Sequence, residues 1–204
     1  MKQFGKNPSG EHREKVNQSL NFKNGSFSNL LPTQMIPKEV SVMDMMTDYF
    51  TTPSDRIPKR IIPSVKTNIN EIDSDKPVIT WFGHSSYHIF ADRKNILVDP
   101  VFCGHASPFP FMINAFKGTD TYSASDFNQV DILILTHDHY DHLDYTCLYQ
   151  LKNRVKKVVC SLGVASHLVF WGYKKELITE LDWWESITLA DITLTAAPAR
   201  HFSG

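Results

Sequence analysis

The chain has 204 residues, of which 42% are hydrophobic and 21% are charged, a composition typical of a globular domain with a sizeable core. Its formal net charge of −1 argues against nucleic acid as the main partner, because phosphate binding needs a clustered basic surface. The sequence has no apolar run of about 18 residues, so we expect no transmembrane helix.

The N-terminus, MKQFGKNPSGEHREK, lacks the apolar region of a secretory signal. The three cysteines, Cys103, Cys147 and Cys160, show no CxxC spacing, which favours reduced thiols over metal ligands. We therefore expect a cytoplasmic protein.

Residues 1–70 are polar and rich in Asn, Ser and Pro, so this segment alone cannot bury much apolar surface. We expect it to be an arm that wraps a folded domain at residues 71–204. Asn24-Gly25 is a turn signal within the arm. Four apolar residues are candidate anchors that pin the arm to the domain: Phe22, Phe27, Leu30 and Leu31.

A short helix is predicted from Pro37 to Phe50, because apolar residues fall on one helical face there. These residues are Val42, Met43, Met46, Tyr49 and Phe50. We expect this face to pack on the domain body. The alternative is a lipid-facing or substrate-gating helix, for which methionines supply an adaptable apolar surface.

Three short strands with tight turns open the domain and predict a β-meander: Val78–Phe82, Tyr87–Phe90 and Ile96–Val98. His84 follows a glycine at the first turn. It is either a structural histidine or a side chain at an active-site mouth that donates a proton or contacts substrate. Asp99 ends the third strand, a position where a simple turn carboxylate is common.

Residues 101–125 are irregular and rich in large apolar side chains, namely Phe102, Phe109, Phe111, Met112 and Phe116. Long loops with many aromatic residues are often binding elements. Two interpretations stay open: an apolar wall or lid for acyl chains, and a loop folded onto its own small cluster.

The segment at residues 131–145, DILILTHDHYDHLDY, begins with an apolar run that predicts a buried strand. His137, His139, Asp141 and His142 follow directly. Neither a helix nor a continued strand puts all four on one face, whereas a turn at the strand end lets them converge. Imidazole nitrogens and a carboxylate that converge in this way predict a site for divalent metal ions. The alternative is a solvated, histidine-rich loop.

Beyond this segment, Asp144 is a good N-cap for a helix that runs to about Arg154. We expect alternating strands and helices after it: a strand at Lys157–Cys160, a helix at Gly163–Trp171, and strands at Leu177–Thr179, Ser186–Leu189 and Ile192–Ala196. This succession predicts an α/β (α+β) sandwich built from two sheets with helices outside.

The HxHxDH pattern after an apolar strand resembles the signature of the metallo-β-lactamase fold superfamily. The resemblance implies a four-layer αββα sandwich that binds two metal ions. Zinc is the default metal, and iron or manganese suits the same ligands. It implies that His137 and His139 bind the first metal and that Asp141 and His142 bind the second. The final PARHFSG resembles the third ligand motif, PAxHxSG, which implies that His201 completes the first site.

Two further stretches, NFKNGSFSNLLP and TWFGHSSYHIF…ILVDP, resemble one branch of that superfamily. This branch contains the N-acylphosphatidylethanolamine-hydrolysing phospholipases D and the ascorbate-6-phosphate lactonases. The resemblance implies that Asp99 orients the metal ligands through hydrogen bonds. It also implies that Asp141 orients a metal-bound hydroxide, which attacks a phosphodiester of a lipid or small molecule, with peripheral membrane contact as a corollary.

In the family, an Asp that bridges the metals and a final His come from a second αβ half. This sequence ends at Gly204, so we expect an N-terminal half of the domain, truncated after the third ligand motif. Two alternatives to the phosphodiesterase stay open. One is a lactonase that acts on a phosphorylated sugar acid, and the other is an inactive metal-binding fragment that needs its second half.

Overall fold

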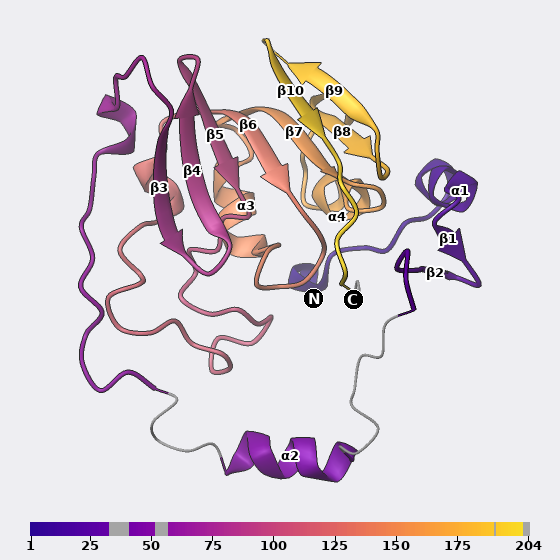
Figure 1. Cartoon of the computed structure of the whole chain (residues 1–204), viewed down its shortest axis with the longest axis horizontal. Helices are drawn as coiled ribbons and strands as arrows, with labels where there is room; N and C mark the ends of the chain where they lie inside the picture. Colours follow the sequence, from indigo (N-terminus) through magenta and orange to yellow (C-terminus); the bar gives the residue numbers. More distant parts are fainter. Residues whose placement is uncertain (33–40, 52–56, 190, 202–204) are drawn as a thin grey trace.

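The computed structural model describes residues 1–32, 41–51, 57–189 and 191–201. Its centre is a six-stranded sheet in the order β3-β4-β5-β6-β7-β8 (Figure 1). The strands are β3 (Val78–Gly83), β4 (Ser86–Ala91), β5 (Lys94–Val98), β6 (Val130–Leu135), β7 (Val155–Ser161) and β8 (Ile178–Leu181). A separate hairpin follows, made of β9 (Ser186–Leu189) and β10 (Ile192–Thr195).

The sheet is antiparallel at one side and parallel at the other. β3, β4 and β5 form the predicted meander, and Asp92 and Arg93 at φ 48° and 56° make the tight turn that joins β4 to β5. From β5 onward the neighbours are parallel, with Leu97 beside Leu133 and Leu133 beside Val158. The carboxyl ends of β5, β6 and β7 therefore lie together at one edge of the sheet.

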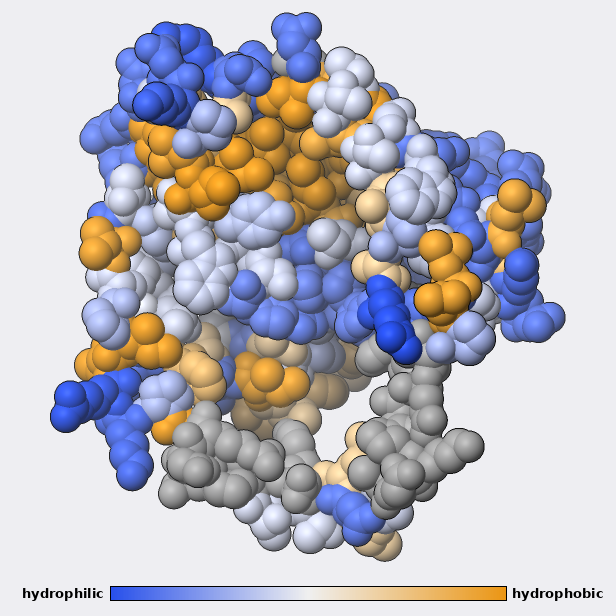
Figure 2. All heavy atoms as spheres, in the orientation of Figure 1, coloured by the Kyte–Doolittle hydropathy of each residue, from blue (hydrophilic) through white to orange (hydrophobic). Residues whose placement is uncertain are grey.

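Both faces of the sheet are apolar, which is why its central strands read as continuous hydrophobic runs. One face packs against α3 (Tyr145–Leu151), α4 (Ala165–Phe170) and the short η4 turn (Ala124–Asp126). The other face carries Ile96, Val98 and Ile132, against which the β9–β10 hairpin packs. Figure 2 shows hydrophobic atoms gathered on this second face over β5 and β6, beside the hairpin.

The mixed α/β class predicted from the sequence is confirmed. Of the four expected layers, the described residues supply a helical layer, the first sheet and the two strands of the β9–β10 hairpin on its second face. Among these residues, no helix is both long enough and apolar enough to cross a membrane.

The N-terminal segment forms η1 (Lys2–Phe4), α1 (Glu11–Gln18) and a small hairpin of β1 (Phe22–Lys23) and β2 (Ser26–Phe27). Among the described residues before β3, Val16 is buried at 2% exposure, and Ile69 is buried in the main core. The prediction that Leu30 and Leu31 are anchors is wrong, because they are 60% and 71% exposed. The predicted anchors Phe22 and Phe27 pack on each other, with ring centroids 5.1 Å apart.

Helix α2 (Val42–Phe50) forms within the predicted range, and residues 37–40 lie outside the described part of the chain. The expectation that it packs on the domain body is wrong, because Met43, Met45 and Met46 are 72%, 48% and 52% exposed. The helix lies apart from the sheet (Figure 1). Its first turn is stabilised locally, since the Ser41 hydroxyl accepts from the Asp44 backbone N–H at 3.1 Å in a capping box.

The segment at residues 101–125 is irregular up to the short η4 turn at Ala124, as predicted. Phe102 folds inward and stacks on Phe127 at 5.7 Å between ring centroids. Phe109, Phe111 and Phe116 stay 38%, 77% and 44% exposed. The loop thus divides its aromatic residues between the core and the surface, and neither of the two open interpretations accounts for all of them.

Candidate metal centre

A carboxylate holds together the ends of two parallel strands. Asp99 follows β5, is 1% exposed, and has φ 41°, a left-handed conformation at the point where the chain leaves the strand. Its Oδ1 accepts the Thr136 backbone N–H at 2.8 Å, and its Oδ2 accepts the Thr136 hydroxyl at 2.6 Å and His142 Nδ1 at 2.8 Å. The hydroxyl of Ser161, at the end of β7, donates to the Thr136 carbonyl. The base of the site therefore spans three adjacent strands.

These hydrogen bonds fix which nitrogen of each imidazole can act as a ligand. Thr136 Oγ1 has one proton, which it donates to Asp99, so it accepts from His137 Nδ1 at 3.0 Å. His142 Nδ1 likewise donates to Asp99. In both rings Nε2 is therefore unprotonated, and its lone pair can bind a metal ion.

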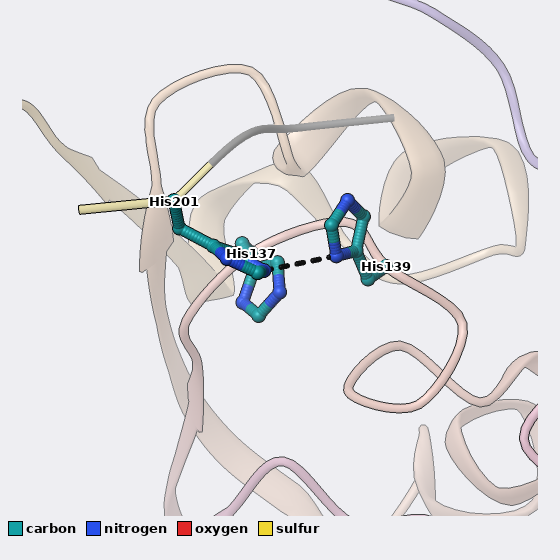
Figure 3. A group of neighbouring side chains, drawn as sticks. All are labelled: His137, His139 and His201. Carbon is teal, nitrogen blue, oxygen red and sulfur yellow. Dashed lines mark hydrogen bonds between the residues drawn. The ribbon is translucent and has the colours of Figure 1, made fainter. Parts of the chain in front are cut away.

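A tight turn begins at His139 and brings His142 back toward the strand end. The backbone N–H groups of His142 and Leu143 both donate to the His139 carbonyl, at 2.9 and 2.8 Å. His137, His139 and His201 then form one cluster, although His201 follows β10 and lies 62 residues from His139 in the sequence (Figure 3). His201 Nε2 is 3.1 Å from His139 Nδ1, and the His137 ring centroid is 4.7 Å from those of the other two histidines.

A second cluster of His84, Asp141 and His142 lies beside the first. His84 Nε2 is 3.0 Å from Asp141 Oδ2, and His142 Nε2 is 3.7 Å from the same oxygen. The two clusters meet where the His137 and His142 rings pack, with centroids 4.0 Å apart. The His84 ring therefore contacts a predicted ligand, and its side chain is 61% exposed.

Burial and the neighbouring histidines lower the pKa values of His137 and His139, which favours their neutral forms. Burial, then the neighbouring His142 and His139, lower the pKa of His137 to about 4. Burial and His201 lower the pKa of His139 as well. Burial is the largest influence on His142 and lowers its pKa, but the hydrogen bond and charge of Asp99 outweigh it, so the net shift is upward. Neutral imidazoles are the form that binds metal ions.

The residues fit a pair of divalent metal ions by their donor atoms. In each cluster the candidate ligand atoms lie within 4.8 Å of one another. Two imidazole nitrogens on a tetrahedral zinc ion lie about 3.3 Å apart, given bonds of about 2.05 Å, and His139 Nδ1 and His201 Nε2 are 3.1 Å apart. His137 Nε2 is buried and forms no hydrogen bond with any described residue. Burying a polar atom without a hydrogen-bond partner costs folding free energy, unless another partner such as a metal ion binds that atom.

Other histidines and the cysteines lie outside the two clusters. His88 is fully buried on β4 and its Nε2 bonds to Asn95 at 3.0 Å, and His105 Nδ1 donates to the Ser107 carbonyl at 2.7 Å. All three cysteines are free thiols. The sequence interpretation missed two groups of the scaffold, Thr136 and Ser161. The signal for Thr136 was its place directly between the strand and the first histidine.

Comparisons with known proteins identify the family of the chain. Residues 94–204, more than half of the chain, match the family model described as "Beta-lactamase superfamily domain". An uncharacterised protein of Mycobacterium tuberculosis is 32% identical over 189 residues, covering 92% of this chain and 51% of that protein. N-acyl-phosphatidylethanolamine-hydrolyzing phospholipase D 1 of Caenorhabditis elegans is 26% identical over 172 residues, covering 76% of this chain and 47% of the enzyme.

The chain spans about half the length of these two curated relatives. A solved structure also matches it: Igni18, a metallo hydrolase of the archaeon Ignicoccus hospitalis, with a TM-score of 0.46 and 21% identity. That match covers 61% of this chain and 49% of Igni18.

Proposed function

Because this chain belongs to the β-lactamase superfamily, we propose that it is the ligand-bearing part of a metal-dependent hydrolase that cleaves a phosphodiester bond in a lipid. The observation that carries this proposal is the pair of adjoining ligand clusters on a base of buried hydrogen bonds. A shared base of this kind holds ligands in place before the metal arrives, which is what metal centres require.

In this proposal His137, His139 and His201 hold the first metal ion, and Asp141 and His142 hold the second. Bound divalent metals supply a hydroxide at neutral pH by lowering the pKa of water, and they stabilise negative charge on the phosphoryl oxygens. The native metal is zinc, iron or manganese, since the same nitrogen and oxygen donors suit all three.

The chain's own residues then have distinct tasks. Asp99 fixes the orientation of His142 through the 2.8 Å hydrogen bond to its Nδ1. Asp141 is held by His84 at 3.0 Å, and the side chain of His84 is 61% exposed, so its ring lies at the rim where substrate arrives. From there His84 can contact a phosphoryl oxygen or hold a proton for the leaving group.

The lipid substrate class rests on exposed apolar side chains in the loop that follows β5. Phe109, Phe111 and Ile113 are 38%, 77% and 60% exposed, and Phe4 packs on Phe109 with ring centroids 6.0 Å apart. Phe109 also packs on Phe111, with ring centroids 5.8 Å apart. An exposed apolar group of this kind is typical of a site for an apolar partner. A lactonase acting on a phosphorylated sugar acid needs a basic pocket in its place. The relative from Caenorhabditis elegans, whose name states a phospholipase D activity, supports the same choice.

The test measures metal content and hydrolysis on the same preparation. Zinc-loaded protein is assayed with bis(p-nitrophenyl) phosphate and with N-acylphosphatidylethanolamine in mixed micelles, and protein dialysed against EDTA is the control. We expect both substrates to be hydrolysed by the loaded protein only, and His137→Ala to abolish both activities. Bound metal without hydrolysis of either ester contradicts the proposal and favours the metal-binding fragment. Hydrolysis of a phosphorylated lactone alone favours the lactonase.

A further inference from the structure

The N-terminal segment is fastened to elements that flank the ligand-bearing end of the sheet. Trp171 Nε1 donates to the Lys2 carbonyl at 2.8 Å, and the Lys6 backbone N–H donates to His167 Nδ1 at 3.2 Å. Further along, Lys15 Nζ donates to the carbonyl of Glu180 in β8 at 3.2 Å. The segment therefore follows α4 and β8 rather than projecting into solvent.

The β1–β2 hairpin then turns the segment toward the third histidine of the first cluster. Asn24 and Gly25 take φ 53° and 87°, the left-handed conformations of a tight hairpin turn. The hairpin is held at its base, because Asn21 Nδ2 donates to Asp182 Oδ1, just after β8, at 3.2 Å. The Ser28 N–H donates to the Asn21 carbonyl at 3.0 Å and so extends the pairing to the residue before Asn29.

Asn29 forms a hydrogen bond with the backbone of His201. Its Oδ1 accepts the His201 backbone N–H at 3.2 Å, across 172 residues of sequence. His201 is beyond the end of β10 at Thr195, so the pairing of the hairpin strands does not set its position. A ligand outside regular structure needs contacts of its own to stay within reach of the metal.

We propose that Asn29 is a positioning residue for His201, so that docking of the N-terminal segment helps to assemble the first metal site. The inference rests on the proposed metal site. Asn29 does not touch the metal or the substrate: it acts by holding the backbone that presents the His201 ring to His139. Loss of the segment's contact then weakens the metal site although all of its ligands are still present.

The test compares four variants in a zinc competition titration with a chromophoric chelator. Asn29→Ala removes the acceptor, and Asn29→Asp keeps an acceptor oxygen in the same place. Asn17→Ala is the matched control, since Asn17 lies exposed on α1 of the same segment. His201→Ala reports the ligand itself. We expect Asn29→Ala to bind the first zinc about three- to tenfold more weakly, while Asn29→Asp and Asn17→Ala bind it as the unaltered protein does.

The ligand field of bound Co²⁺ separates positioning from a general loss of structure. We expect the visible absorption bands of the Co²⁺ form to change in Asn29→Ala and to return in Asn29→Asp. Unchanged zinc affinity in Asn29→Ala, with weakened affinity in His201→Ala, overturns the role of Asn29 alone. Equal loss in Asn29→Ala and Asn29→Asp overturns it as well. Unchanged zinc affinity in His201→Ala overturns the metal site itself.

Discussion

Replacing Asp99 by Asn tests whether the buried carboxylate organises the metal centre. Asp99→Asn keeps the shape of the side chain and exchanges one acceptor oxygen for an NH₂ group. Oδ1 can still accept the Thr136 N–H, but Oδ2 accepts both the Thr136 hydroxyl and His142 Nδ1. An NH₂ group at that place puts a donor against the N–H of His142. Relief requires His142 to move its proton to Nε2, which removes the lone pair that a metal needs.

The size of the effect follows from burial. Asp99 is 1% exposed, so the mismatched donors are shielded from water and cost about 2 kcal/mol, within the usual range of about 1–3. For a chain of this length that corresponds to a fall in Tm of about 4–8 °C. Loss of a hydrogen-bonding partner behind a ligand lowers metal affinity about 10- to 100-fold.

Thermal unfolding followed by circular dichroism in EDTA measures the first effect, and zinc competition titration measures the second. Asp75→Asn is the control, because the Asp75 side chain is 98% exposed and its ion pair with Arg93 is 3.7 Å long. If Asp99→Asn matches this control in both Tm and zinc affinity, the carboxylate does not organise the site.

Two further predictions concern the N-terminal segment and a half-buried thiol. Gly5→Ala should lower Tm more than Gly10→Ala. Both glycines have positive φ, so the backbone strain of an alanine is similar at the two positions. An added Cβ at Gly5 lies 2.0 Å from His167 Nδ1, whereas an added Cβ at Gly10 has no atom within 4 Å. Equal Tm values contradict the docking of the segment. Burial, then the charge of Asp144, raises the pKa of Cys103 to about 12, so its thiol is protonated at pH 8. We expect iodoacetamide to label Cys103 about a thousandfold more slowly than it labels glutathione, as followed by mass spectrometry, with the rate rising toward high pH. If Cys103 is labelled as fast as glutathione, its pKa is not raised.

The strand and turn that carry the ligands were predictable because their signals are local. An apolar run predicts β6, and the four polar residues directly after it can converge only at a turn. The mixed α/β class followed from the order of strands and helices. The contact between Asn29 and His201 was not predictable, because it joins residues 172 positions apart and depends on the path of the chain between them.

The exposure of α2 shows a second limit. Its apolar face was a sound reason to expect packing, since amphipathic helices usually cover a core. The periodicity says which face of a helix is apolar, but not whether another element lies opposite that face. The described methionines of α2 stay exposed, and the helix is instead stabilised within its own first turn by the capping box of Ser41 and Asp44.

The place of the metal centre follows from the direction of the strands. β5, β6 and β7 are parallel, so Asp99, Thr136 and Ser161 arrive together at one edge of the sheet. Open sheets with parallel strands bind their ligands at this edge, where loops are free to vary. Here the strand ends supply the fixed hydrogen bonds, and the loop after β6 supplies His137, His139 and His142. The hydrogen bonds of this base therefore position the ligands of the loop against the rigid end of the sheet.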